Sequence, residues 1–354
     1  TGAGYAMGIR SGAEMTTFEM RFIALRCKDT IAPTGTIAQG VGAKQVNSLG
    51  EVYETKYGLT TSERVYGTVM ENLEGRGPCY LRTEGISPQQ DESLRKAYLN
   101  MAPSQTLKWV EAGKNPSEQN VEIEGTEPYI VGGHTASGYW VNTERETTIH
   151  GLYAAGDVAG GCPQKYVTGA MVEGEIAAID MVSKLDADTS DGSPDTSAFD
   201  EKKALEAKAS EYDHFLTERP QMFTTEAIEE AMQKVMDNYA GGISTHYQFN
   251  GKQLALAKEK INHLIELTGD LYASDMHELM FIYELKERLT VCLSVIAHLG
   301  ARKETRWHSF AENLDYPHKS DDWMKYVNSK YENGQLHMIY RELVGREARY
   351  EHND

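Results

Sequence analysis

The sequence predicts an α/β core, a mixed α+β region and a helical C-terminal region. The core is indicated by residues 148–178, where a short apolar run, a Gly-Asp pair, a glycine-rich loop and a helical run follow one another. Residues 30–127 are polar and rich in glycine, and they contain two helical stretches, which indicates the mixed region. Four successive segments with helical spacing beyond residue 200 indicate the C-terminal region.

The first ten residues contain the pattern Gly-x-Gly-x-x-x-Gly. No strand precedes this pattern, so it does not predict a phosphate-binding loop. We expect a helix to about Met15 and then a strand over residues 17–25, which leads to Arg26. Arg26 is either a solvated arginine or an anion ligand, because its planar charged fork can bind a sulfate or phosphate through two bonds.

The mixed region predicts helices over residues 90–100 and 104–112. An apolar strand then ends at Gly133, where the lack of a side chain lets the backbone pass close to a flat ligand. His134 follows directly. A lone histidine after a strand is often structural, so these residues alone leave its role open.

The central unit begins with a predicted buried strand over residues 151–155, which ends at Gly156-Asp157. After the loop we expect Thr168 to cap a helix and Gly169 to let a ligand approach its first turn. Free amides at the start of a helix can face a phosphate or an electron-rich ring oxygen. An ordinary βα turn would have the same pattern.

Residues 186–200 contain almost no hydrophobic side chains and read as a linker. Helices are predicted over residues 201–217, 225–240, 252–267 and 274–299. The tail, residues 325–344, alternates around Asn333-Gly334, which predicts a hairpin. This hairpin is either a docking surface or a packed tail.

Composition limits the possible functions. With 354 residues the chain is long enough for two or three domains, and its net charge of −18 speaks against nucleic acid or an anionic membrane surface as a partner. No run of eighteen apolar residues predicts a membrane span, and no signal peptide is visible. The start, Thr-Gly-Ala-Gly, lacks a methionine, and we expect a fragment of a longer chain.

The four cysteines, Cys27, Cys79, Cys162 and Cys292, are scattered, and no pair has Cys-x-x-Cys spacing. We therefore expect neither a zinc site nor an iron–sulfur cluster in this chain. Buried thiols in a reducing cytoplasm are the expected state, so a cytoplasmic location is predicted.

Three motifs carry a resemblance to known flavoproteins. The pattern from Thr148 to Asp157 resembles the second FAD fingerprint of two-dinucleotide-binding flavoproteins. Residues 153–174 are similar to the flavin-binding end of the fumarate reductase/succinate dehydrogenase flavoprotein superfamily. Within them, Gly-Asp-Val-Ala-Gly-Gly-Cys-Pro-Gln-Lys-Tyr resembles the alpha subunits of dissimilatory adenylylsulfate (APS) reductases. The stretches 302–306 and 315–317 also match the closing signature of that superfamily.

The resemblance implies a division of the chain into domains. Residues 1–25 and 128–185 would form an α/β FAD-binding domain that lacks its N-terminal βαβ unit. Residues 26–127 would be an α+β capping domain, residues 186–200 a linker, and residues 201–354 a C-terminal helical domain with a tail hairpin.

The implied reaction interconverts APS with sulfite plus AMP through a flavin N5–sulfite adduct. Arg26 would be the charge clamp and His134 a hydrogen-bond or proton donor at the sulfo group. Lys165 stands where fumarate reductases carry a dicarboxylate-gripping arginine, and Arg26-Cys27 stands where they carry a His-Pro-Thr element. Both departures count against a dicarboxylate substrate. The implied FAD-binding residues are Gly133, Gly156, Asp157, Gly160, Gly161, Lys165, Tyr166, Thr168, Gly169 and Ala170.

The resemblance also implies a partner. Two-electron chemistry needs an electron supply, and the family uses a small iron–sulfur beta subunit similar to a bacterial ferredoxin, so an alpha–beta heterodimer is expected. The alternatives are a fumarate reductase/succinate dehydrogenase-type flavoprotein or related oxidase, and a non-catalytic subunit that uses the fold as a scaffold.

Overall fold

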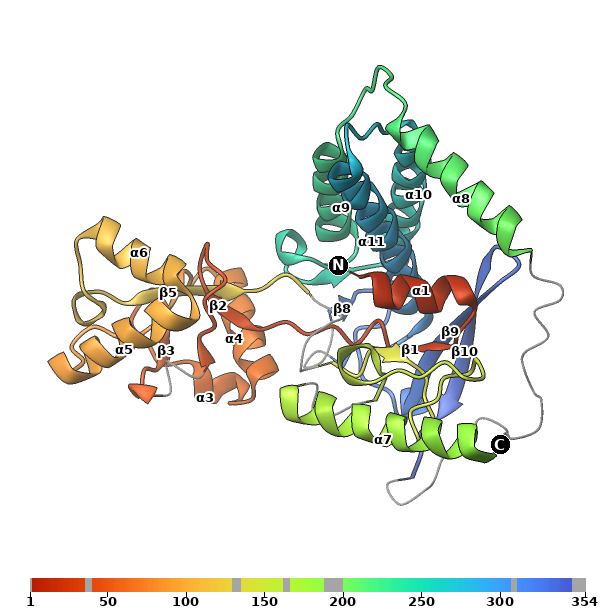
Figure 1. The fold of residues 1–354 in the computed structure, drawn as a ribbon. Coiled ribbons are helices and arrows are strands. Elements are labelled where there is room, and N and C mark those ends of the chain that lie inside the picture. The colour runs from red at the N-terminus through yellow and green to blue at the C-terminus, as the bar shows by residue number, and fades with distance from the viewer. Residues whose placement is uncertain are drawn as a thin grey trace. The chain divides into compact units, whose positions relative to one another are not determined.

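The computed structural model describes residues 2–35, 40–128, 135–161, 166–187, 200–306 and 311–345 (Figure 1). Contacts divide the chain into two units. The first comprises Thr1–Arg21, Ile130–Thr305 and Ala311–Asp354, and the second comprises Phe22–Tyr129 and Arg306–Phe310. Both units combine helices with antiparallel sheet, so the chain has a mixed α and β fold.

The first unit contains a four-stranded antiparallel sheet in the order β10-β9-β1-β6. Its strands are β1 (Met15–Thr16), β6 (Gly138–Tyr139), β9 (Lys325–Glu332) and β10 (Gln335–Glu342). Met15 of β1 pairs with Tyr139 on one side and with Ser329 on the other. This small sheet therefore joins segments from the beginning, the middle and the end of the sequence.

The C-terminal hairpin predicted from Asn333-Gly334 is confirmed. Both turn residues have positive φ angles, 51° and 79°, as a two-residue turn of the I′ type requires. Strand β9 lies between β10 and β1, and Val327, Asn328 and Ser329 in it are buried. The base of the hairpin is therefore a packed tail.

Helix α1 (Ala3–Ser11) is shorter than predicted, because Gly12 takes the left-handed conformation that ends it. The strand predicted over residues 17–25 is wrong. Thr17 has a φ of 55° and the chain turns directly after it, which places Phe18 and Glu19 in the interior. Contacts with the C-terminal part of the chain outweigh the local preference for an extended strand there.

The four C-terminal helices are confirmed within two residues at each end. They are α8 (Glu201–Leu216), α9 (Thr225–Tyr239), α10 (Gly251–Leu267) and α11 (Met276–Ala301). Each is capped by a side chain that accepts a bond from a first-turn amide: Asp200, Thr224, Asn250 and Asp275. Helices α9, α10 and α11 pack against one another (Figure 1).

A buried ionic cluster, formed by Glu19, His298, Arg302 and Glu304, joins the N-terminal segment to the end of α11. Arg302 donates through Nε to Glu19 at 2.8 Å and through Nη1 to Glu304 at 3.0 Å. The Nδ1 atom of His298 lies 3.2 Å from Glu19, and its Nε2 atom lies 2.8 Å from the Ser329 hydroxyl. This Arg302 cluster holds α11, the hairpin and the segment after β1 together.

A second buried carboxylate ties the hairpin to the same segment. Glu14 accepts bonds from Arg341 at 2.6 and 2.7 Å and from the Asn328 amide at 2.6 Å. Its backbone N–H donates to the hydroxyl of Thr148, at the start of the central unit. Glu14 thus anchors the last strand beside the loop that the sequence marks as functional.

The second unit contains a sheet in the order β2-β5-β4-β3, with all pairs antiparallel. Its strands are β2 (Leu25–Cys27), β3 (Gln45–Val46), β4 (Cys79–Leu81) and β5 (Val121–Gly125). Its helices are α3 (Glu54–Tyr57), α4 (Thr61–Leu73), α5 (Pro88–Met101) and α6 (Pro103–Ala112). Helices α5 and α6 confirm the two helices predicted for this region.

The two faces of this sheet differ in polarity. Cys27, Ile123 and Cys79 lie opposite one another in the register and are buried. Alternate residues, among them Arg26 and Glu124, point to the other face, which carries the charges. Arg26 is therefore a strand residue on the polar face of an α+β unit.

Besides the long helix α7 (Val167–Ala187), the other described elements are short. They are strands β7 (Gln248–Phe249) and β8 (Glu312–Asn313), which pair in parallel, and 3-10 helices η1 (Pro116–Glu118), η2 (Gly156–Val158), η4 (Ile243–Thr245), η5 (Thr268–Asp270) and η6 (Asp321–Trp323). Within the described ranges, no helix combines the length and the apolar character needed to cross a bilayer.

Candidate functional site

The segment before the glycine-rich loop is extended but is not a regular strand. Where the sequence predicts a strand over residues 151–155, the structure has a single bridge between Tyr153 and Glu146. The Ala154 N–H donates to the Arg145 carbonyl at 3.0 Å. Gly151, with a φ of 76°, lies in a turn that the Leu152 N–H closes on the Ile149 carbonyl at 3.0 Å, and the described residues 152–155 form no ladder after it, so the predicted strand is wrong.

Gly156 lies at the tip of this segment, at the start of η2, and has a φ of 70°. A Cβ atom at this position would lie 3.2 Å from the Cβ of Ala170 in α7 (Val167–Ala187). Asp157 is exposed, and its carbonyl accepts a 2.6 Å bond from the hydroxyl of Tyr5 in α1. The Gly-Asp pair is thus fixed between α1 and the first turn of α7.

The two glycines that follow have different structural roles. The Gly160 N–H donates to the Tyr139 carbonyl at 2.8 Å, and a Cβ on Gly160 would lie 2.2 Å from Thr16 Cγ2 and 2.6 Å from that carbonyl. Gly161 has a φ of 72°, and a Cβ there would meet no atom of the described residues within 4 Å. Gly160 is required for backbone packing, whereas Gly161 has an open face toward the described residues.

Helix α7 begins at Val167, so Thr168 lies inside its first turn. The prediction that Thr168 caps this helix is therefore wrong. The helix begins at Val167, one residue before the threonine that was expected to precede it. Thr168 and Tyr166 are exposed, and Gly169 and Ala170 are half-buried. The first-turn amides still lack partners within the helix, which gives this end a positive character. Lys165 lies outside the described residues.

Ion pairs hold α7 against the segment before the loop. Glu173, which is buried, pairs with Arg145 at 3.0 Å, and Lys184 pairs with Glu146 at 2.7 Å. An open pocket of about 560 Å³ lies beside the second pair. Much of the remaining surface of α7 is apolar and exposed, at Val167, Met171, Val172, Ile179, Val182 and Leu185.

Arg26 of β2 is held by two carboxylates. Its Nε donates to Glu124 at 3.1 Å and its Nη1 donates to Glu127 at 2.9 Å. Partial burial favours the neutral form, but the attraction of Glu127 and Glu124 outweighs it and raises the pKa of Arg26, so the side chain stays cationic. Among the described residues, the Nη2 atom of Arg26 has no hydrogen-bond partner.

Arg26 belongs to the second unit, whereas the glycine-rich loop belongs to the first. His134 and Gly133 lie outside the described residues. The sequence interpretation missed Glu124 and Glu127. The antiparallel pairing of β2 with β5 is the signal that would have identified Glu124.

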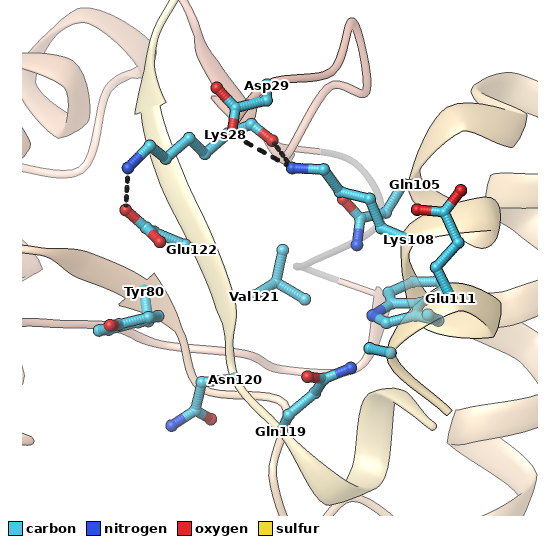
Figure 2. Close-up of a pocket in the computed structure, with 12 residues that line it drawn as sticks. Lys28, Asp29, Tyr80, Gln105, Lys108, Glu111, Gln119, Asn120, Val121 and Glu122 are labelled. Carbon is cyan, nitrogen blue, oxygen red and sulfur yellow. Dashed lines mark hydrogen bonds and ion pairs between the residues drawn. The ribbon is translucent and has the colours of Figure 1, made fainter. Parts of the chain in front are cut away.

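Figure 2 shows an open pocket of about 560 Å³ in the second unit, beside Lys28. Lys28 pairs with Glu122 at 2.7 Å, and Lys108 donates to the Lys28 carbonyl at 2.6 Å. The amide of Gln105 reaches into the same pocket between α6 and β5. Arg26 is not among the lining residues, so this pocket is separate from the charge clamp predicted from the sequence.

The chain is similar to known oxidoreductases, although no protein-family model matches it. It is 28% identical to the adenylylsulfate reductase subunit alpha of Megalodesulfovibrio gigas, covering 94% of this chain and 58% of that protein. It is 24% identical to an uncharacterized FAD-dependent oxidoreductase of Methanocaldococcus jannaschii, covering 91% of this chain and 58% of that protein. The chain therefore spans less than two thirds of the length of these relatives.

Solved structures give the same result. The adenylylsulfate reductase of Archaeoglobus fulgidus matches with a TM-score of 0.86 and 31% identity, over 98% of this chain and 62% of that chain. An adenosine-5-phosphosulfate reductase in complex with sulfite, as a covalent adduct, matches over the same shares with a TM-score of 0.87 and 30% identity. The quinol–fumarate reductase of E. coli shares the fold, with a TM-score of 0.80 and 16% identity over 99% of this chain and 63% of that chain. The chain is therefore similar to adenylylsulfate reductases over nearly its whole length, as the resemblance of residues 156–166 predicts.

Proposed function

We propose that this chain is the flavoprotein part of an APS reductase, which interconverts APS with sulfite plus AMP. The observation that carries the proposal is the sequence identity to APS reductases, which is nearly twice that to the fumarate reductase. The fold alone does not discriminate between these enzymes, since all of them share it. The APS-like loop sequence and the two departures from the dicarboxylate pattern point the same way.

The local geometry fits FAD as the cofactor. Among the described residues no atom lies within 4 Å of a Cβ at Gly161, Thr168 is exposed, and α7 begins here with its positive end, a combination that suits a dinucleotide. The proposed FAD contacts are Gly156, Asp157, Gly160, Gly161, Tyr166, Thr168, Gly169 and Ala170, with Gly133 and Lys165 added by resemblance. FAD, when bound, supplies the two-electron chemistry.

Arg26 is the proposed charge clamp. In the reductive direction two electrons enter APS, the bond between sulfur and the bridging oxygen breaks, and sulfite and AMP leave. Negative charge grows on the phosphate and sulfo oxygens in this step, so a fixed cation stabilises the transition state more than the ground state. The cationic state of Arg26 and its Nη2 atom, which has no hydrogen-bond partner among the described residues, support this role. His134 is proposed by resemblance to donate a hydrogen bond or a proton to the sulfo group.

Turnover assays separate this function from its rivals. We expect the FAD-loaded full-length enzyme to consume APS with reduced viologen as the electron donor and to leave fumarate unchanged. Rapid reduction of fumarate would favour a fumarate reductase and would overturn the APS assignment. Turnover of neither substrate, with FAD bound, would favour a scaffold subunit.

We further propose that the working unit is a cytoplasmic heterodimer with an iron–sulfur beta subunit, through which electrons reach FAD. The name of the M. gigas relative, "subunit alpha", supports a second subunit. Co-purification of the full-length protein from its native source, with analysis of iron and flavin content, tests this. A fully active preparation that contains FAD but no iron and no second chain would contradict it.

A further inference from the structure

Arg26 is held by two carboxylates that differ in how firmly they are fixed. Glu124 lies directly opposite Arg26 in the register of β2 and β5, and its Oε1 also accepts the backbone N–H of Asp29 at 3.1 Å. Glu127 lies beyond the end of β5, and its side chain is 59% exposed, against 24% for Glu124. Among the described residues, Arg26 is the only hydrogen-bond or ion-pair partner of the Glu127 side chain.

The positions of these contacts on the guanidinium decide what else it can bind. A guanidinium offers two faces with paired donors, the Nε/Nη2 side and the Nη1/Nη2 end. Glu124 occupies Nε and Glu127 occupies Nη1, so each face of Arg26 has one donor taken. Departure of Glu127 restores the complete Nη1/Nη2 end, while Glu124 continues to orient the group.

We propose that Glu124 is the positioning residue of Arg26 and that Glu127 is an internal competitor, which occupies the anion-binding end of Arg26 until an anionic ligand displaces it. This inference rests on the proposed role of Arg26 in binding the sulfo or phosphate group. The carboxylate of Glu127 and two oxygens of a sulfate would bind the same donors of Arg26. Repulsion between these two anions prevents both from occupying the Nη1/Nη2 end together. The exposed Glu127 side chain gains solvation when it leaves, whereas the strand and the Asp29 amide retain Glu124.

The expected gain in anion affinity follows from the exposure of the ion pair between Arg26 and Glu127. Exposed ion pairs contribute little, so removing the competitor should tighten anion binding by about 1.5- to 5-fold. Loss of Glu124 acts in the opposite direction, because the fork loses its fixed orientation. It should raise the KM for APS and lower kcat together.

The experiment uses the FAD-loaded full-length enzyme and inorganic sulfate as the probe. Dissociation constants are measured by calorimetry at constant ionic strength for Glu127→Gln, Arg26→Ala and the double variant, and KM and kcat for APS are measured alongside. Glu122→Gln is the matched control, since Glu122 lies on the same strand and pairs with Lys28 (Figure 2). We expect Glu127→Gln to lower the dissociation constant for sulfate and the KM for APS with little change in kcat. Glu122→Gln should leave that dissociation constant and that KM unchanged.

The outcomes distinguish the inference from the proposed function. If Arg26→Ala weakens sulfate binding and Glu127→Gln does not tighten it, the competitor role is overturned while the clamp role of Arg26 remains. If Glu127→Gln tightens binding equally in the Arg26→Ala background, the effect is general charge repulsion and the competitor role is also overturned. If Arg26→Ala leaves sulfate binding and the KM for APS unchanged, the proposed clamp itself is wrong.

Discussion

Replacing Gly160 by alanine should destabilise the first unit, and the structure gives the magnitude. The added Cβ would lie 2.2 Å from Thr16 Cγ2 and 2.6 Å from the Tyr139 carbonyl, well inside van der Waals contact. The Tyr139 carbonyl belongs to the backbone of β6 and cannot rotate away. The loop must therefore move, which costs about 1–3 kcal/mol of packing strain and about 1 kcal/mol for the weakened Gly160–Tyr139 hydrogen bond.

Urea unfolding followed by circular dichroism measures this cost, for which we expect about 2–4 kcal/mol in the free energy of unfolding. Gly174→Ala is the matched control. Gly174 lies inside α7, and a Cβ there would meet no atom of the described part of the chain within 4 Å. This substitution should therefore stabilise the chain by about 0.5–1 kcal/mol, as expected for alanine in place of glycine in a helix.

The test is strict because Gly160→Ala is expected to lower the free energy of unfolding and Gly174→Ala to raise it. If Gly160→Ala unfolds at the same urea concentration and with the same slope as the unmodified protein, the close approach of the loop to β6 is wrong. If both substitutions destabilise to the same extent, the chain does not tolerate change anywhere in this segment, and the loss of stability does not come from the contacts of the added Cβ atom.

Three further predictions concern the rest of the chain. Arg302→Met should lower the free energy of unfolding by about 3–5 kcal/mol in urea titrations, because it removes the guanidinium that neutralises the buried carboxylates of Glu19 and Glu304; a loss below about 1 kcal/mol would contradict that pairing. Burial favours neutral Glu211, but hydrogen bonds from Lys208, Tyr283 and Lys286 lower the pKa of Glu211 to about 2. The contribution of ionised Glu211 to stability should therefore be complete above the usual glutamate pKa of about 4.3 and fade as the pH falls towards 2. Thermal melts of Glu211→Gln should differ from those of the unmodified chain at pH 6 and converge with them near pH 2. Burial raises the pKa of Cys27 to about 11, so iodoacetamide at pH 8 should label Cys27 only after unfolding; mass spectrometry that finds rapid labelling of the folded chain would refute this.

The sequence predicted those elements whose signals are local. The C-terminal helices begin where Asp200, Thr224, Asn250 and Asp275 cap them, and a cap needs only the next three residues. The hairpin turn likewise needs only Asn333 and the glycine after it. In both cases the residues that decide the structure are neighbours in sequence.

The failures have the opposite cause. Residues 17–25 have strand character, but Glu19 is drawn into the Arg302 cluster, whose other members are about 280 residues away in sequence. Residues 151–155 are apolar enough for a strand, yet strand formation also depends on a neighbour with which to pair. No local pattern contains that information.

The candidate site shows the same division. The sequence shows a single signal, a glycine-rich loop, for Gly156, Gly160 and Gly161. Only the three-dimensional structure distinguishes the packing role of Gly160 from the open face that Gly161 has toward the described residues. Arg26 was predictable as a cation after a strand. Its two carboxylates lie 98 and 101 residues further along the chain, so their hold on Arg26 depends on strand pairing that the sequence does not state.

The anchoring of Glu14 by Arg341 has a consequence for biosynthesis. The two residues are 327 positions apart. A ribosome that adds about 5–20 residues per second needs roughly 16 to 65 s to make the chain between them. Throughout that interval the nascent first unit lacks its last strands, and the carboxylate of Glu14 must stay in water. The Phe22–Tyr129 segment is continuous and can fold while synthesis proceeds. The first unit should consequently be the part of the nascent chain that proteases cut and chaperones bind.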